Sequence, residues 1–136
     1  MKDDMLDNSN VQLDEPNAMV ERYARRSIGD LYSMLRPEVW QGVQERQRVI
    51  LRLFARCFGW KDFTGLALTE VGCGSGGNLL DFIRFGFEPH NLCGIELLPE
   101  RAAAARLSLP AATTIHAGDA NSIDIEPGSQ NVVFQS

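Results

Sequence analysis

The sequence predicts an α/β fold in which helices cover a doubly wound parallel sheet. Two observations lead to this prediction. Along residues 62–136, short apolar segments read as strands, and helical patterns separate the first three of them, an order typical of parallel pairing. A glycine-rich stretch, "EVGCGSGGNLL", joins the first strand to the first of these helices, at the edge where open α/β sheets bind ligands.

A long amphipathic helix is predicted ahead of the sheet. Pro37 suits a first-turn position and Gly59 suits a C-terminal cap, so the helix should fill most of the interval between them. The apolar residues that recur at helical spacing and should face the core include Trp40, Ile50, Phe54 and Cys57. The arginines predicted to form its solvated side are Arg46, Arg48, Arg52 and Arg56.

Strand and helix signals follow to the end of the chain. The predicted strands cover residues 64–71, 91–97, 113–117 and 131–136. The predicted helices cover residues 78–86 and 99–109. A doubly wound domain normally continues beyond its fourth strand, so we expect the chain to be about the first half of a larger, truncated domain.

Composition and charge divide the chain into three parts. Residues 1–20 carry a net charge of −4 and are predicted to be a mobile acidic leader. Residues 21–61 carry +5 and form an N-terminal helical segment, whereas residues 62–136 carry −6 and form a ligand-binding half-domain. The stretch "ERYARR" at residues 21–26 is interpreted as a solvated basic segment, and an arm that closes over a ligand is the alternative.

Charge and cysteine content argue against several classes of protein. The net charge of −5, with basic residues concentrated only in residues 21–61, disfavours a nucleic-acid partner. The three cysteines lie far apart without a CxxC spacing, so we expect neither a metal site nor disulfides, and a cytoplasmic location. No signal peptide is evident and no apolar run approaches the roughly 18 residues that span a bilayer, so no membrane partner is expected.

The glycine-rich stretch fits the fingerprints of two different ligands. Gly72, Gly74 and Gly77 have the GxGxxG spacing of a dinucleotide fold, and Glu96 lies 19 residues beyond Gly77, where a ribose-binding acid is expected. The same stretch also fits the pattern E-x-G-x-G-x-G, which begins at Glu70. Spacing alone therefore leaves both ligands open.

The charge of Glu70 distinguishes between these ligands. A dinucleotide places its pyrophosphate at this loop, and a carboxylate at the strand end would repel that anion. S-adenosylmethionine has an amino group and a sulfonium but no phosphate, so it is compatible with an acid there. Glu96 and Asp119 lie at or just past the carboxyl ends of the next two strands. In chain order, the three acids match the methionine end, the ribose and the adenine of S-adenosylmethionine.

Residues 64–136 resemble the first half of a class I S-adenosylmethionine-dependent methyltransferase, of the small-molecule kind called methyltransferase domain 11. In this resemblance, "EVGCGSGG" is similar to the first motif of the family, "GIELLPE" to its ribose-binding acid with the following helix, and "AGDA" to its adenine-contacting acid. The resemblance covers slightly over half of the chain. It implies a Rossmann-like sheet with the strand order 3-2-1-4.

The resemblance also implies which residues contact the methionine portion of the cofactor. Gly72, Gly74 and Gly76 would let the backbone pass close to it, and Cys73 lies in the same loop. Glu70 would hold its amino group, directly or through water.

The other cofactor contacts implied by the resemblance lie on the second, third and fourth strands. Glu96, with Leu97 beside it, would bind both ribose hydroxyls. Asp119 and Ala120 would meet the adenine. Gln135, with the following Ser136, would lie beside the transferable methyl group.

The implied activity is methyl transfer from S-adenosyl-L-methionine to a small-molecule or saccharide acceptor. Displacement at a sulfonium depends chiefly on proximity and orientation, and the family builds its acceptor pocket after the fourth strand, so no catalytic residue is assigned. Amino-methylating nucleic-acid members of the family have an Asn/Asp-Pro-Pro-aromatic motif there. This chain has "FQS", which argues against nucleobase methylation.

Two alternatives stay open. In the first, the chain is a catalytically incomplete fragment that binds the cofactor weakly or not at all, and residues 131–136 form a sheet edge available for self-association. In the second, the chain is an NAD(P)-binding domain, which Glu70 disfavours.

Overall fold

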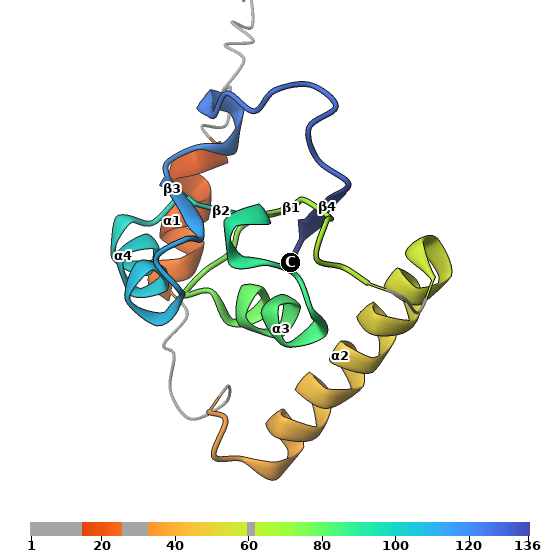
Figure 1. Ribbon diagram of the computed structural model, residues 1–136. Helices are drawn as coiled ribbons and strands as arrows, with labels where there is room; N and C mark the ends of the chain where they lie inside the picture. The colour runs from red at the N-terminus through yellow and green to blue at the C-terminus, as the bar shows by residue number, and fades with distance from the viewer. Residues whose placement is uncertain (1–14, 26–32, 60–61) are drawn as a thin grey trace, which may run out of the picture.

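The computed structural model describes residues 15–25, 33–59 and 62–136, and within the first range it describes no side chain beyond Arg22. In chain order the elements are α1 (Glu15–Arg25), α2 (Pro37–Phe58), β1 (Leu68–Val71), α3 (Gly77–Phe85), η2 (Pro89–Asn91), β2 (Leu92–Glu96), α4 (Pro99–Ser108), β3 (Thr114–Ala117), η3 (Ala120–Ser122) and β4 (Val132–Gln135), where η marks a short 3-10 helix (Figure 1).

The strands form one parallel sheet in the order β3-β2-β1-β4, which confirms the predicted fold class and strand order. Glu70 of β1 pairs in register with Gly94 of β2 and with Phe134 of β4. Such neighbours point to the same face of a sheet, so these residues face one side together. Because the strands are parallel, their carboxyl ends meet at one edge.

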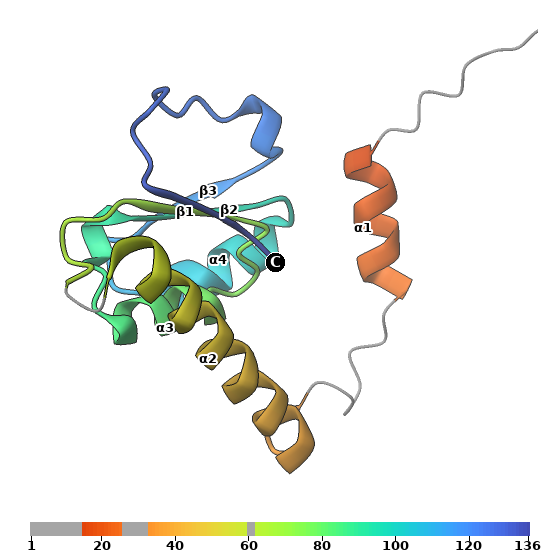
Figure 2. The same ribbon diagram turned by 90° about the vertical axis from the view of Figure 1, so that its right-hand side faces the viewer.

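Helices α2, α3 and α4 lie on one side of the sheet, whereas the connection from β3 to β4 passes over the other side (Figure 2). Right-handed crossovers from β1 to β2 and from β2 to β3 run in the same direction, which places α3 and α4 on one face. Gly94 allows close packing there, because a Cβ atom at this position would lie 2.9 Å from Leu79 Cδ1 of α3. Helix α1 lies beyond the carboxyl edge of the sheet (Figure 2).

A cluster of phenylalanine rings joins α2 to α3 and the sheet. The centroid of the Phe54 ring lies 5.7 Å from that of Phe82 and 5.6 Å from that of Phe87. Phe82 in turn contacts Phe134 of β4, with the ring centroids 5.2 Å apart. Burial of each such ring contributes roughly 1.5–3 kcal/mol, so this cluster holds the long helix against the body.

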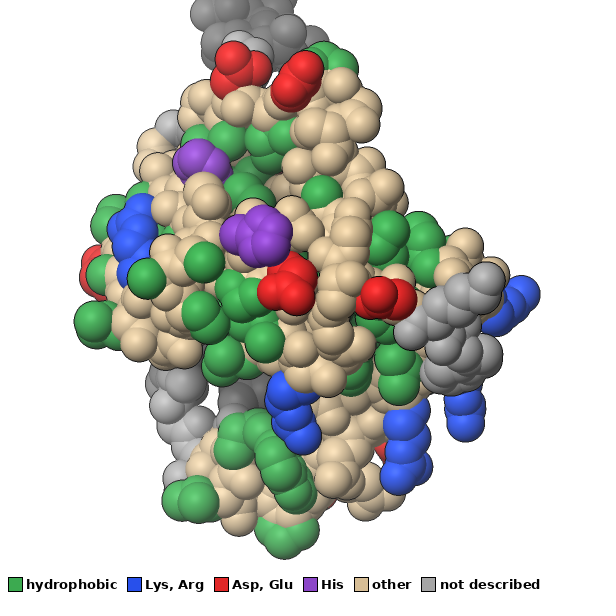
Figure 3. Space-filling view, viewed as in Figure 1, with side chains coloured by type: hydrophobic (Ala, Val, Ile, Leu, Met, Phe, Trp, Pro, Cys, Tyr) green, Lys and Arg blue, Asp and Glu red, His purple; other side chains and the backbone are tan. Residues whose placement is uncertain are grey.

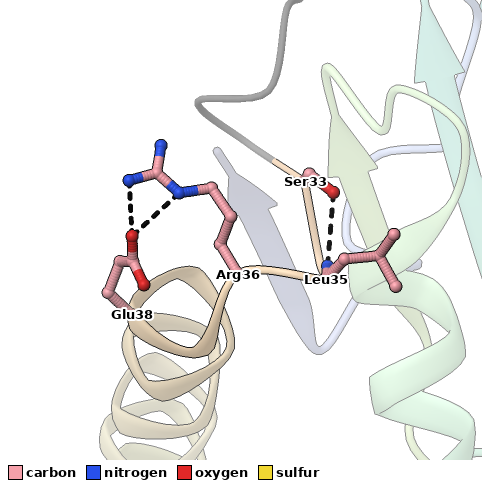
Figure 4. Close-up of polar contacts among 4 residues, drawn as sticks. All are labelled: Ser33, Leu35, Arg36 and Glu38. Carbon is pink, nitrogen blue, oxygen red and sulfur yellow. Dashed lines mark hydrogen bonds and ion pairs between the residues drawn. The ribbon is translucent and has the colours of Figure 1, made fainter.

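Helix α2 begins and ends at the predicted residues, with Pro37 in its first turn and Gly59 as its C-cap. At its N-terminus, Arg36 Nε donates to Glu38 Oε1 at 2.8 Å, and Nη2 of the same guanidinium also contacts that oxygen (Figure 4). Just before it, Leu35 N donates to the Ser33 hydroxyl at 3.3 Å. Glu38 is thereby held in the first turn, where a negative charge interacts favourably with the helix dipole.

The packing of α2 differs from the prediction at two residues. Its buried residues are Ile50, Phe54 and Ala55, so the buried contacts of the helix lie in its second half. Trp40 lies in the first half and is 47% exposed, although its spacing places it on the apolar stripe. Cys57 is also exposed, because it lies at the edge of that stripe.

Two boundaries differ by more than one residue from those predicted. The first strand begins at Leu68 and not at residue 64, because residues 64 and 65 form a turn closed by a hydrogen bond from Leu66 N to Phe63 O at 3.1 Å. Helix α1 begins at Glu15, so residues 15–20, the last part of the predicted leader, are helical. Residues 1–14 lie outside the described part of the chain, and the three-part division stays a prediction. Within the described ranges, every helix falls short of the length or the apolarity that a membrane crossing demands.

Candidate functional site

A pocket with a cavity volume of about 200 Å³, open to solvent, lies between the carboxyl edge of the sheet and α1. Glu15, Pro16 and Met19 of α1 form one wall of it. The remaining lining residues end or follow the strands; they are Val71, Gly72, Ile95, Glu96, Leu97, Gly118, Asp119, Ala120, Asn121, Gln135 and Ser136. The pocket therefore lies where the sequence predicts ligand binding.

Glu96, the last residue of β2, is held by two backbone amides. Gly74 N donates to Glu96 Oε2 at 2.8 Å, and Leu98 N donates to Oε1 at 2.9 Å. The side chain is 4% exposed, yet it lines the pocket. A carboxylate oxygen can accept two hydrogen bonds, so each oxygen keeps a lone pair for a ligand hydroxyl. Glu96 is thus pre-oriented for a pair of neighbouring hydroxyl groups.

Asp119 lies two residues past β3 and caps the short helix η3. Its Oδ1 accepts a hydrogen bond from Asn121 N at 3.0 Å, which leaves the second carboxylate oxygen for a ligand. The preceding residue connects this turn to the second strand, because Gly118 N donates to the backbone oxygen of Glu96 at 2.9 Å. The two acids are therefore placed on one wall of the pocket by the same backbone contact.

The glycine loop turns back over the end of β2. Gly72 N and Cys73 N both donate to the backbone oxygen of Ile95, at 2.8 and 3.0 Å. Gly76 has a φ of +90°, and a Cβ atom on it would lie 2.8 Å from Leu109 Cδ1. A Cβ atom on Gly74 would lie 2.8 Å from the guanidinium of Arg101. These two glycines thus permit close packing against α4 and its C-terminal end, whereas Gly72 reaches the pocket.

Glu70 is fully buried in β1 and is connected to the long helix through a side-chain amide. Asn78 Nδ2 donates to Glu70 Oε1 at 2.6 Å, and Arg46 Nη2 donates to Asn78 Oδ1 at 2.7 Å. The other carboxylate oxygen, Oε2, has no hydrogen-bond partner among the described residues. Burial raises the pKa of Glu70; the hydrogen bond from Asn78, the nearby Ser136 hydroxyl and the charge of Arg46 oppose this rise.

The Cys73 thiol lies between the two buried acids. Burial and the charges of Glu70 and Glu96 raise its pKa to about 12. A thiol with such a pKa is almost fully protonated at neutral pH and is a poor nucleophile. Cys73 is 5% exposed and belongs to the hydrophobic core, so its side chain acts in packing.

The structure brings most of the predicted site residues to the pocket, and a minority lie behind its surface. Those that line it are Gly72, Glu96, Leu97, Asp119, Ala120 and Gln135. Those outside the lining are Glu70, Cys73, Gly74 and Gly76. Contact with a ligand stays a prediction for the residues of both groups.

Sequence reasoning did not assign the α1 residues that line the pocket. The signal was present, because an acid and a proline in the order Glu15-Pro16 are typical of a helix start. The lining side chain Met19 lies on the face of the helix one turn further along. The alternative of a ligand-covering arm concerned residues 21–26, whereas the α1 residues that meet the pocket precede that stretch.

The pocket is acidic. Its charged side chains are Glu15, Glu96 and Asp119, and no Lys or Arg among the described residues lines it. On the face of the molecule that Figure 3 shows, most of the basic side chains gather over α2. A pocket with this lining attracts cations and repels phosphate groups.

No family model matches the chain, and no curated protein matches it in sequence. Solved structures do. An S-adenosylmethionine-dependent methyltransferase from Mesorhizobium loti matches 63% of this chain and 36% of its own chain, with a TM-score of 0.50 and 21% identity. The chain therefore has the class I S-adenosylmethionine-dependent methyltransferase fold over the matched part.

Two other solved structures match with lower TM-scores. The amino pentose methyltransferase CalS10 from Micromonospora echinaspora is 30% identical, with 60% of this chain and 31% of that chain covered at a TM-score of 0.47. The sugar N-methyltransferase KedS8 from Streptoalloteichus is 26% identical, with 60% of this chain and 29% of that chain covered at a TM-score of 0.45. The chain spans about a third of the length of the solved structures that it matches.

Proposed function

We propose that the chain is the cofactor-binding part of an S-adenosylmethionine-dependent methyltransferase. The observation that supports this most strongly is the acidic lining of the pocket at the carboxyl edge of the sheet, with Glu96 and Asp119 on adjacent strand ends and no lining Lys or Arg among the described residues. S-adenosylmethionine is cationic at its sulfonium and its amino group and has no phosphate, so the charge of this pocket fits it. The same lining disfavours NAD(P), whose pyrophosphate is an anion.

The residues present fit the parts of this cofactor. The Glu96 carboxylate, already fixed by Gly74 N and Leu98 N, would accept hydrogen bonds from the two ribose hydroxyls. Asp119 would accept from the adenine amino group, beside Ala120 and the apolar side chain of Leu97. Gly72, Gln135 and Ser136 would surround the methionine end.

When bound, S-adenosylmethionine supplies an electrophilic methyl group that a nucleophile displaces in line. The contribution of this chain is to hold and orient the cofactor, which is the larger part of catalysis in such a displacement. The strand-end carboxylates would fix the nucleoside. The apolar side chains of Val71 and Ile95 would limit the access of water to the pocket floor. We assign no described residue as the catalytic base.

The acceptor is proposed to be a small molecule or a saccharide. The net charge of −5 and the acidic pocket oppose the approach of a polyanion, so a nucleic-acid acceptor is disfavoured. The alternative is a catalytically incomplete chain that binds the cofactor weakly or not at all. A titration with the cofactor distinguishes the two.

Calorimetric titration of the 136-residue chain tests the proposal. We expect S-adenosylmethionine and S-adenosylhomocysteine to bind with a dissociation constant of about 1–100 μM. Glu96→Ala should weaken both by about tenfold or more, because the ribose hydroxyls lose a charged acceptor. Glu88→Ala, which changes an exposed acid away from the pocket, is the control. Binding of NADH alone would contradict the proposal, and binding of no ligand would favour the incomplete fragment.

A further inference from the structure

Arg46 is an exposed residue on the outer side of α2, where a solvated side chain is predicted. Its guanidinium is nevertheless connected to a buried carboxylate, through the side chain of Asn78. Its Nη2 donates to Asn78 Oδ1 at 2.7 Å, and Asn78 Nδ2 donates to Glu70 Oε1 at 2.6 Å. The chain of contacts thus runs from α2 through α3 to β1. It joins a surface cation to an acid with no exposed area.

The guanidinium fixes the direction of the Asn78 amide. Arg46 can only donate hydrogen bonds, so it must meet the amide oxygen, and this leaves the amide nitrogen to face Glu70. If the amide turned over, it would present its nitrogen to the guanidinium and its oxygen to the carboxylate, and both hydrogen bonds would be lost. Arg46 therefore orients the Asn78 amide so that its nitrogen donates a hydrogen bond to Glu70.

Opposing groups act on the Glu70 carboxyl group from every side. Burial, and to a smaller extent the nearby Glu96 carboxylate, favour its neutral form, whereas Asn78, the Ser136 hydroxyl and the charge of Arg46 favour its ionised form. The buried Cys73 thiol is neutral at physiological pH and contributes no charge. The Arg46–Asn78 pair is therefore one of the two contributions, with Ser136, that favour the ionised form of Glu70.

Glu70 lies next to the pocket lining along β1. It precedes the lining residues Val71 and Gly72, and the nearby Ser136 hydroxyl, which donates to Gly72 O at 3.2 Å, belongs to a residue that lines the pocket itself. Glu70 Oε2 has no hydrogen-bond partner among the described residues. A buried carboxylate oxygen without a hydrogen-bond partner lowers the stability of the fold, unless a hydrogen-bond donor or a cation lies close to it.

We propose that Arg46, acting through Asn78, is a positioning residue that keeps Glu70 ionised and oriented next to the pocket lining, where its charge attracts the ammonium group of the ligand. This inference rests on the proposed function for the identity of the ligand. The role of Arg46 toward Glu70 rests on the structure alone. A purely structural tether between α2 and α3 is the competing explanation, and it predicts a loss of stability without any change in the charge of Glu70.

The first experiment measures the pKa of Glu70 by carbon-13 NMR of its carboxyl group in the ligand-free chain. Arg46→Met should raise this pKa, because the cation is lost and the Asn78 amide is free to turn. Arg46→Lys should restore most of the original value, since it keeps a cationic donor. Arg52→Met is the matched control, because Arg52 is an exposed residue of the same helix for which the described part of the chain shows no hydrogen bond or ion pair. An unchanged pKa in folded Arg46→Met would overturn the inference.

The second experiment compares two ligands that differ in the amino-acid moiety. S-adenosylhomocysteine has the ammonium group, whereas 5′-methylthioadenosine lacks it. Arg46→Met should weaken the first ligand by about fivefold at pH 7 and change the second by less than about twofold. The midpoint of the pH dependence for S-adenosylhomocysteine should move to higher pH, as the raised pKa requires.

The outcomes separate this inference from the proposed function. Equal weakening of both ligands in Arg46→Met would identify a structural tether and overturn the positioning role. If the unaltered chain binds neither ligand, the proposed function fails and the attraction of the ammonium group fails with it. In that case the carboxyl pKa of Arg46→Met still decides whether Arg46 controls the ionisation of Glu70.

Discussion

At the scale of single residues, Glu70 combines complete burial with a charged neighbour, Glu96, and with an oxygen that has no hydrogen-bond partner among the described residues. Such an arrangement lowers the stability of a folded domain, because the ionised carboxylate loses its hydration. Binding sites often retain residues of this kind, since the ligand supplies the missing interaction. Glu70 is therefore expected to decrease the stability of the folded chain while it increases the affinity for the ligand.

Glu70→Gln should stabilise the chain at neutral pH. The pKa of Glu70 is raised in the folded state, so the unfolded chain loses its proton first as the pH rises above the ordinary value of 4.5. The free energy of unfolding therefore falls from that pH up to the folded-state pKa and is constant above it. Glu70→Gln has no titrating group at position 70, so its free energy of unfolding does not fall over this pH range. Above the folded-state pKa of Glu70, the variant should therefore be more stable than the unaltered chain by about 1 kcal/mol or more.

Urea unfolding of both proteins across pH 4–9 measures this difference. Glu88→Gln, at an exposed acid, is the control and should follow the unaltered chain at every pH. A stability difference between Glu70→Gln and the unaltered chain that does not change with pH would show that the pKa of Glu70 is the same in the folded and unfolded chain, and would contradict the raised pKa.

At the scale of the elements, the close approach of α3 to the sheet depends on a missing side chain in β2. A Cβ atom on Gly94 would lie 2.7 Å from Cys73 Sγ, 2.8 Å from Ile115 Cδ1 and 2.9 Å from Leu79 Cδ1. Three neighbours from the loop, β3 and α3 would have to move at once. The glycine is therefore required by packing and not by its backbone angles.

Gly94→Ala should lower the free energy of unfolding by about 1–3 kcal/mol, the usual cost of overpacking a core. Gly42→Ala is its counterpart, because Gly42 lies in α2 with no atom within 4 Å of the added methyl group. That substitution should raise the free energy of unfolding by about 0.5–1 kcal/mol through helix propensity. Thermal and urea unfolding measure both, and equal effects of the two substitutions would contradict the packing described for β2.

The elements themselves could be predicted from the sequence because their signals are local. Proline and glycine mark both ends of α2, and short apolar segments separated by helical patterns identify a parallel sheet. The positions of Glu96 and Asp119 followed from the rule that strand ends share an edge.

Contacts that depend on the rotation or docking of a helix could not be predicted in this way. Arg46 and Asn78 are 32 residues apart, and their contact depends on how α2 lies across α3. The burial of Glu70 next to the pocket lining depends on the turn of the glycine loop over β2, and no local pattern encodes it. The position of Met19 depends on the docking of α1, which the predicted leader left out.

At the scale of the whole molecule, the sheet has an open side. In the described part of the chain, β4 is an edge strand, and Val133 on it is 69% exposed. An exposed apolar edge strand is a template for pairing with another chain. Self-association through β4 therefore stays a prediction for this chain.

Light scattering coupled to gel filtration tests this prediction. The unaltered chain should show an average mass that rises with concentration, and Val133→Lys should shift it toward the monomer mass of 15.1 kDa. Leu107→Lys is the control, because Leu107 is 90% exposed on α4 and lies outside the edge strand. A monomer at all concentrations would contradict pairing through β4.

The central claim is that the acidic pocket at the carboxyl edge binds S-adenosylmethionine. Amide chemical shifts of the 136-residue chain, recorded during a titration with S-adenosylhomocysteine, test it most directly. We expect saturable shifts at Gly72, Leu97, Asp119 and Ala120, and none of comparable size along α2. Shifts confined to other surfaces, or the same shifts with NADH and none with S-adenosylhomocysteine, would contradict it.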